Sequence, residues 1–199
     1  MAISAKQYEQ MVGRMTGGGK KAADTKAAGA APQHKVIIGI DPSLRGTGFG
    51  LIQWDQGRSI ILEQGTIVCK KDWKNSRCLA RIHDVLREAI LKYQPTACAI
   101  EGLFYAQNYR TALVMGEARG AALVAAGSLG LEIYEMAPRK VKQAIVGYGN
   151  AQKIAVAKMV QRMLSLDEVP DADAADALAL ALAFAQEQGR RFGVLPKQI

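Results

Sequence analysis

The sequence predicts an α/β sandwich built on a five-stranded mixed sheet whose first three strands form a meander. The expected elements follow the order β-β-β-α-β-α-β-α-α-α, and tight turns join the first three strands. The 199 residues are 49% hydrophobic, 22% charged and 6% aromatic, which is typical of one compact domain with a real core. Together these observations favour helices packed against a mixed sheet.

Three apolar strands begin the predicted domain. They are expected at Val36–Asp41, Gly48–Trp54 and Ser59–Val68. Turn-forming residues at Pro42–Thr47 and Asp55–Arg58 separate them. Because both connections are short, the three strands are expected to form the meander.

Helices then alternate with two further strands. Asn75–Gln94 is expected to be helical, because apolar residues recur at spacings of three and four and share one face. Pro95 stops this helix, and Ala97–Glu101 is a short apolar strand that ends on an acid. A long helix rich in glycine and alanine is expected at Asn108–Ser128, and Leu131–Met136 is the fifth strand.

Three helices complete the predicted fold. Pro138 opens the first of them at the position that proline favours. The segment Gly147–Gly149 interrupts the helical pattern before a second helix at Ala151–Leu164. Pro170 precedes the last helix, Asp173–Gln188, which is expected to be buried because it consists largely of alanine, leucine and phenylalanine.

The chain is expected to divide into three regions: a flexible basic extension rich in Ala, Gly and Lys at residues 1–34, a domain at 35–188, and a basic C-terminal tail at 189–199. No run reaches the roughly 18 to 20 apolar residues that span a bilayer, and the N-terminus lacks the apolar core of a secretory signal. The three cysteines lack metal-ligand spacing and indicate reduced thiols. They are Cys69, Cys78 and Cys98. A cytoplasmic protein without a membrane partner is therefore expected.

Positive charge is concentrated in two parts of the chain. The net charge is +8, and residues 1–35 hold six Lys and Arg against two acids. The stretch Met136–Ser165 holds six further cations and no acid. These are Arg139, Lys140, Lys142, Lys153, Lys158 and Arg162. A basic strip facing an acidic remainder indicates a polyanionic partner, with nucleic acid as the default and a solvated helix face as the alternative.

Several acids stand where a structural role does not require them. Asp41 and Glu101 end apolar strands, and ligands of α/β sheets bind in the crevice outside the strand ends. Asp173 and Asp176 are three residues apart and therefore share one helical face. Taken singly, each acid could be a helix or turn cap. Taken together beside the basic strip, they favour a site for hard divalent cations, and two such ions roughly 4 Å apart suit phosphodiester hydrolysis.

The glycine-rich turn after the first strand has a second interpretation. The segment that starts at Gly39 resembles the phosphate-binding loop of actin-like and sugar-kinase ATPases. Those proteins close two related domains over the nucleotide, whereas the roughly 165 residues after the extension supply one domain and contain no second such loop. The nuclease interpretation is therefore preferred.

Four motifs together resemble a known family. They are GIDPSLRGTGFG, AIEGLFYAQNYRTALVMGEARGAALVAA, RKVKQAIVGYGNAQK and DADAADALALALA. In this order and spacing, over Val36–Gln186, the chain resembles the bacterial RuvC family of Holliday-junction resolvases, within the RNase H-like superfamily. The resemblance implies an RNase H-like three-layer sandwich and a DNA endonuclease of recombination and repair. It also implies a homodimer that nicks a four-way junction symmetrically, with branch-migration proteins of the RuvA/RuvB type as partners. The small-residue helix Asn108–Ser128 is the candidate dimer interface.

The resemblance also implies roles for individual residues. The four acids would bind two Mg²⁺ ions, with Mn²⁺ as an expected substitute, and catalyse hydrolysis. They are Asp41, Glu101, Asp173 and Asp176. Asp171 lies outside the family pattern and is expected to be a helix cap.

The remaining implied site residues are expected to contact DNA. The family's aromatic residue after the second acid falls on Phe104, which would stack on an unpaired base, with a core position as the alternative. Lys153 is expected to meet the scissile phosphate and to take part in catalysis. The residues expected to follow the DNA backbone are Lys142, Arg139 and Lys140.

Some positions depart from the family pattern, and two other functions compete. Ser43 stands where glycine is usual, Glu117 stands where glutamine is expected, and residues 1–34 lie outside the pattern. One alternative is a YqgF-type nuclease acting on RNA or another branched nucleic acid, against which the basic block Arg139–Lys153 and the chain length argue. The other is a non-catalytic junction-binding protein, which should lack at least one of the four acids.

Overall fold

The computed structural model describes residues 34–55, 57–102, 108–189 and 195–199, all within the unit Pro32–Ile199. Its strands are β1 (Val36–Asp41), β2 (Gly46–Asp55), β3 (Arg58–Val68), β4 (Ala97–Glu101), β5 (Glu132–Met136) and β6 (Lys197–Gln198). Its helices are α2 (Asn75–Tyr93), α3 (Tyr109–Gly127), α4 (Pro138–Val146), α5 (Lys153–Met163) and α6 (Ala172–Gly189). Among the described residues, none of the helices combines the length and apolarity that crossing a bilayer requires.

The strands form one mixed sheet in the order β3-β2-β1-β4-β5-β6. The strands β1, β2 and β3 pair antiparallel, as the predicted meander requires, and β1, β4 and β5 pair parallel. The prediction of five strands was one too few, because Lys197 pairs with Glu135 and Gln198 with Tyr134 at the outer edge. A strand of two exposed residues has no apolar alternation, so only its pairing reveals it.

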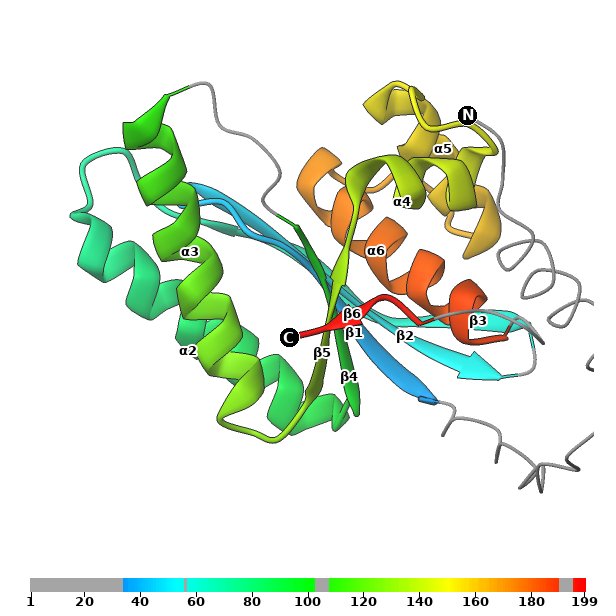
Figure 1. Ribbon diagram of the computed structural model, residues 1–199, viewed down its shortest axis with the longest axis horizontal. Helices are drawn as coiled ribbons and strands as arrows, with labels where there is room; N and C mark the ends of the chain where they lie inside the picture. Colours follow the sequence, from blue (N-terminus) through cyan, green and yellow to red (C-terminus); the bar gives the residue numbers. More distant parts are fainter. Residues whose placement is uncertain (1–33, 56, 103–107, 190–194) are drawn as a thin grey trace, which may run out of the picture. The chain divides into compact units, whose positions relative to one another are not determined.

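Helices cover both faces of this sheet, which confirms the three-layer α/β sandwich (Figure 1). The strand side chains alternate between the faces, as the pleat requires. Ile37 and Ala99 belong to the core under α4, α5 and α6. Ile38 and Ile100 belong to the core under α2 and α3. Each of these four side chains is 0% exposed, so β1 and β4 form the centre of the fold.

The helix α6 lies directly on the backbone of the first two strands. A Cβ atom added to Gly39 would stand 2.0 Å from the carbonyl oxygen of Ala177, and one added to Gly48 would stand 1.9 Å from that of Asp173. Neither distance is possible for a real side chain, so these glycines permit the close approach of helix and sheet. As a result, the first turns of α6 are held over β1 and β2, and Asp41 is the last residue of β1.

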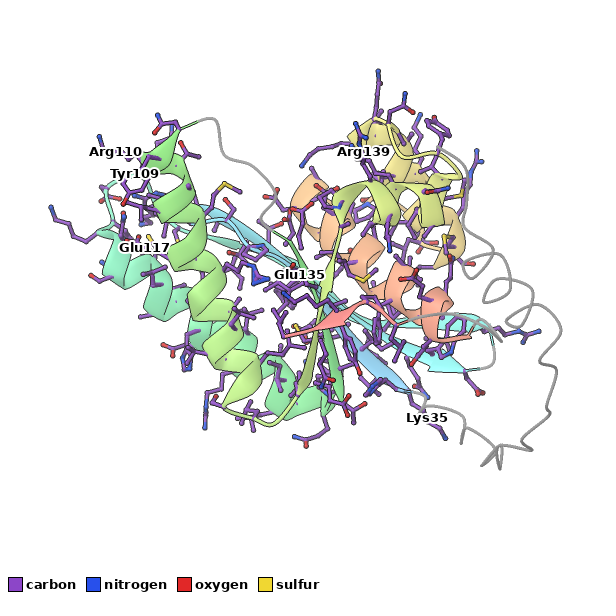
Figure 2. The ribbon with its side chains drawn as sticks, in the orientation of Figure 1. Lys35, Tyr109, Arg110, Glu117, Glu135 and Arg139 are labelled. Carbon is purple, nitrogen blue, oxygen red and sulfur yellow. The ribbon has the colours of Figure 1, made fainter. Side chains whose placement is uncertain are left out.

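In addition to its apolar core, the opposite layer is linked to the sheet by a partly buried ion pair. Arg119 of α3 is 7% exposed and donates a hydrogen bond to the carboxylate of Glu135 on β5, which Figure 2 labels. The three cysteines are free thiols and all are buried, and burial raises the pKa of Cys98 to about 12. These contacts belong to the scaffold and leave the carboxyl ends of β1 and β4 available for a site.

Candidate active site

Two of the predicted acids meet at one edge of the sheet. Asp41 is the last residue of β1 and Glu101 is the last residue of β4. The two strands are parallel neighbours with Ile40 opposite Ile100, so both acids leave the sheet side by side. This juxtaposition follows from the strand pairing and agrees with the expectation that ligand groups gather outside strand ends.

A third acid reaches this edge from the helical layer. Asp176 lies one turn into α6, and its Oδ2 atom accepts a hydrogen bond from the Nζ atom of Lys153 at 2.6 Å. Lys153 is the first residue of α5, a helix that packs beside α6. The hydrogen bond to Asp176 raises the pKa of Lys153, which therefore stays charged at neutral pH.

These side chains line one cavity of about 200 Å³. Its polar lining consists of Asp41, Glu101, Asp176, Lys142 and Lys153. Its apolar wall consists of Pro138, Val141, Val156, Ala179 and Leu180. The helices α4, α5 and α6 thus bring two cations of the basic strip to three of the four predicted acids.

The cavity holds more negative charge than its lysines neutralise. Burial, followed by repulsion from Glu101 and Asp176, raises the pKa of Asp41 from 3.8 to about 7, and Lys153 opposes this rise. A carboxyl group whose ionisation is resisted by neighbouring carboxylates is suited to a divalent cation, because the cation relieves the repulsion. Carboxylate oxygens are also the ligands that Mg²⁺ prefers. The donor set of the cavity therefore fits such an ion.

The fourth predicted acid points toward a different neighbour. Asp173 lies in the first turn of α6, and a Cβ added to Gly46 at the start of β2 would stand 2.7 Å from its Oδ2 atom. Asp173 is absent from the cavity lining, although its charge helps to raise the pKa of Lys153. Within the described ranges, no three His, Cys, Asp or Glu side chains are arranged to hold one metal ion.

The other predicted DNA-contacting residues lie in different places. Lys142 is half-buried and lines the cavity with the acids, whereas Arg139 is exposed on α4, where Figure 2 labels it. Lys140 instead lines a separate cavity of about 240 Å³ together with Glu187 of α6. Phe104 lies outside the described residues.

Sequence reasoning missed the glycines that place the acidic helix. Gly39 was predicted to lie inside the first strand and Gly48 to begin the second, but neither was given a packing role, whereas both admit the backbone of α6. The signal that could have revealed this role was the presence of glycine inside two otherwise apolar strands.

Comparison with known proteins now identifies the family. Residues 37–184 match the family described as Crossover junction endodeoxyribonuclease RuvC. This chain belongs to that family. The Crossover junction endodeoxyribonuclease RuvC of Shewanella amazonensis is 47% identical over 147 residues, which cover 74% of this chain and 84% of that protein. The protein of the same description from Akkermansia muciniphila is 42% identical over 146 residues, or 73% of this chain and 87% of that protein.

Solved structures confirm the RNase H-like fold of the family. T. thermophilus RuvC in complex with a Holliday junction substrate superposes with a TM-score of 0.72 at 35% identity, covering 76% of this chain and 93% of that one. The yeast mitochondrial Holliday junction resolvase Ydc2 superposes with a TM-score of 0.58 at 12% identity, covering 81% of this chain and 83% of that one, a likeness of fold alone. The resemblance predicted from the four sequence motifs is thus confirmed.

Proposed function

We propose that this chain is a divalent-metal-dependent endonuclease that resolves four-way DNA junctions by paired symmetric nicks, in recombination and repair. The observation that carries the proposal is the cavity that joins Asp41, Glu101 and Asp176 to Lys153 in a member of the RuvC family. The T. thermophilus relative is in complex with a Holliday junction substrate, which supports the same substrate class here. The 42–47% identity to curated RuvC enzymes does not favour a YqgF-type or non-catalytic protein.

The acids are proposed to hold the metal. Asp41, Glu101 and Asp176 share the cavity, and Asp173 would join them from the first turn of α6. We expect two Mg²⁺ ions, with Mn²⁺ able to replace them. Bound Mg²⁺ would supply Lewis-acid stabilisation of the phosphate charge and activation of water. The reaction is phosphodiester hydrolysis, in which water attacks phosphorus in line and the 3′ oxygen leaves, so that the products carry a 5′ phosphate and a 3′ hydroxyl.

The cations are proposed to position the DNA strand. In the free protein Lys153 donates to Asp176 and partly neutralises the cavity. When a phosphate enters, the 68% exposed side chain of Lys153 can transfer its hydrogen bond to the scissile group. Lys142 lines the same cavity and would hold a neighbouring phosphate, and Arg139 and Lys140 would follow the backbone further away. Phe104 keeps its predicted stacking role as part of this proposal.

The assembly is proposed to be a homodimer, because a four-way junction needs two related nicks. Leu113 and Val124 of α3 are 50% and 60% exposed, and their spacing places them on one helical face. Gly120 lies between them, and a Cβ atom there would have no neighbour within 4 Å. This face supports α3 as the interface.

The proposal has three further parts. The partners would be branch-migration proteins of the RuvA/RuvB type, and the location would be cytoplasmic. The basic regions 1–34 and 189–199 would contact DNA.

A cleavage assay tests the proposal directly. A labelled synthetic four-way junction and a linear duplex of the same sequence are incubated with the protein, with and without Mg²⁺. We expect symmetric nicks in the junction alone, only when Mg²⁺ is present. Asp41→Asn should abolish cutting while junction binding persists, because removing negative charge cannot weaken attraction to phosphate. Equal cutting of the linear duplex, or undiminished cutting by Asp41→Asn, would contradict the proposal.

A further inference from the structure

An exposed tyrosine lies between the two lysines of the cavity in the sequence. Lys142 lies on α4 and Lys153 begins α5, and the connection between these helices carries Tyr148. The side chain of Tyr148 is 52% exposed. Ile154, next to Lys153, is 56% exposed. Exposed apolar side chains therefore accompany the cations in this part of the chain.

The backbone that carries Tyr148 is held on both sides. Gly147 adopts φ 98°, a left-handed helix cap, and its N–H donates to the carbonyl of Gln143 at 3.0 Å. A Cβ atom added to Gly149 would stand 3.3 Å from the carbonyl oxygen of Arg139, so the turn packs closely on the start of α4. Ala151, a little further along, is 1% exposed. The ring is thus presented to solvent by a packed turn.

The charges around this turn suit a nucleic acid strand. The stretch Met136–Ser165 holds six cations and no acid of its own, although Lys153 pairs with Asp176 of α6, so this stretch attracts phosphates. Proteins that hold unpaired strands combine such a strip with aromatic rings on which bases stack. The Tyr148 ring is half exposed on the connection between two helices that each carry a cavity-lining lysine, which is the kind of position that this mode of binding uses.

We propose that Tyr148 stacks on an unpaired or unstacked base of the junction strand whose phosphates the Lys142–Lys153 surface holds. The inference rests on the proposed junction-resolving function and deepens it. The contact is non-ionic, so it contributes to affinity and to the register of the strand without changing the number of phosphates that the protein neutralises. The ring carries the effect, and the hydroxyl group is dispensable.

Binding is measured in the cleavage-deficient Asp41→Asn background, so that the junction stays intact. Adding Tyr148→Ala should weaken junction binding by roughly ten-fold and leave the dependence of log K on log salt unchanged. Tyr148→Phe should bind as tightly as the background protein. Lys142→Ala provides the contrast, because it should reduce the salt slope by about one unit. Ile60→Ala is the matched control, since Ile60 is 62% exposed on β3, and it should have no effect.

A series of junctions, each with one abasic site near the crossover, locates the contacted base. One abasic position should weaken binding of the protein with Tyr148 by the same factor as Tyr148→Ala, and should cause no further loss in that variant. If no abasic site distinguishes the two proteins, or if Tyr148→Ala and Tyr148→Phe both bind like the background, the inference is overturned. If the background protein itself fails to bind a four-way junction, the proposed function fails first.

Discussion

At the scale of single residues, Asp41 determines the charge balance of the site. Its carboxyl group is buried, and Glu101 and Asp176 repel its ionised form, so its pKa is raised to about 7. The protonated form is consequently favoured by the folded protein, whereas the unfolded chain ionises near pH 3.8. The stabilisation that results is complete below pH 3.8 and is lost as the pH rises through about 7.

This imbalance predicts a pH-dependent stability in the absence of metal. In EDTA, the free energy of unfolding should fall as the pH rises from 4 to 7, with a contribution from Asp41 approaching about 1.4 kcal/mol per pH unit. Asp41→Asn should remove this contribution, and Lys153→Ala should extend it to higher pH because Lys153 opposes the rise. Urea unfolding at several pH values measures the difference between the proteins. Parallel curves for wild type and Asp41→Asn would show that Asp41 ionises normally.

Substitutions of the two cavity lysines should affect different steps, one the rate of cleavage and the other the affinity for the junction. Lys153→Ala should depress single-turnover cutting at saturating protein, because a cation at the scissile phosphate acts mainly on the transition state. Lys142→Ala should weaken junction binding and reduce the salt slope by about one unit. Cleavage rates at saturation and binding titrations at several salt concentrations test both variants. If both variants bind the junction more weakly but cleave it at the wild-type rate at saturation, the catalytic role assigned to Lys153 is wrong.

At the scale of secondary-structure elements, the contact of α6 with β1 and β2 controls where the acids lie. The helix carries Asp173 and Asp176 and has a continuous run of buried residues from Ala177 to Ala185. It can approach the sheet this closely because Gly39 and Gly48 lack side chains. The position of the acidic pair is thus set by helix–sheet packing at the backbone of Asp173 and of Ala177, the residue after Asp176.

Gly39→Ala should therefore destabilise the protein severely. The added Cβ would stand 2.0 Å from the Ala177 carbonyl oxygen, and the clash involves backbone on both sides. We expect a loss of at least about 3 kcal/mol, at the upper end of the range for overpacking. Gly116→Ala is the control, because a Cβ there has no neighbour within 4 Å and alanine favours a helix by roughly 0.5–1 kcal/mol. Thermal melting compares the two, and equal midpoints would contradict the packing argument.

At the scale of the whole molecule, the proposed dimer predicts a measurable mass. The chain has a mass of 21.4 kDa, and sedimentation equilibrium should give about twice that value at micromolar concentration. Val124→Glu should favour the monomer, because a charge would enter the exposed α3 face. Ile60→Glu places the same charge on β3 and should leave the dimer intact. A monomeric wild-type protein that still nicks junctions symmetrically would contradict this assembly.

Much of the fold and part of the site could be predicted from local patterns. Strand and helix boundaries were predicted to within about two residues, because period-two and period-3.6 patterns and the prolines at 95, 138 and 170 act locally. The positions of Asp41 and Glu101 at the ends of apolar strands were predicted in the same way, whereas the pairing of those two strands was not predicted. The strand β6 was missed, because its two residues are exposed and form a strand only by pairing with β5.

The sequence by itself determined the family, the α/β layering and the residues that carry the chemistry, since motifs and hydrophobic periodicity are properties of neighbouring residues. Only the tertiary structure decided which neighbours those residues contact. Helical spacing puts Asp173 and Asp176 on one face, yet Asp176 meets Lys153 in the cavity while Asp173 approaches Gly46. Likewise Lys142 lines the cavity with the acids, whereas Lys140 lines another with Glu187. Spacing along a helix specifies a direction, but the neighbour met in that direction depends on how closely the helix packs on the sheet.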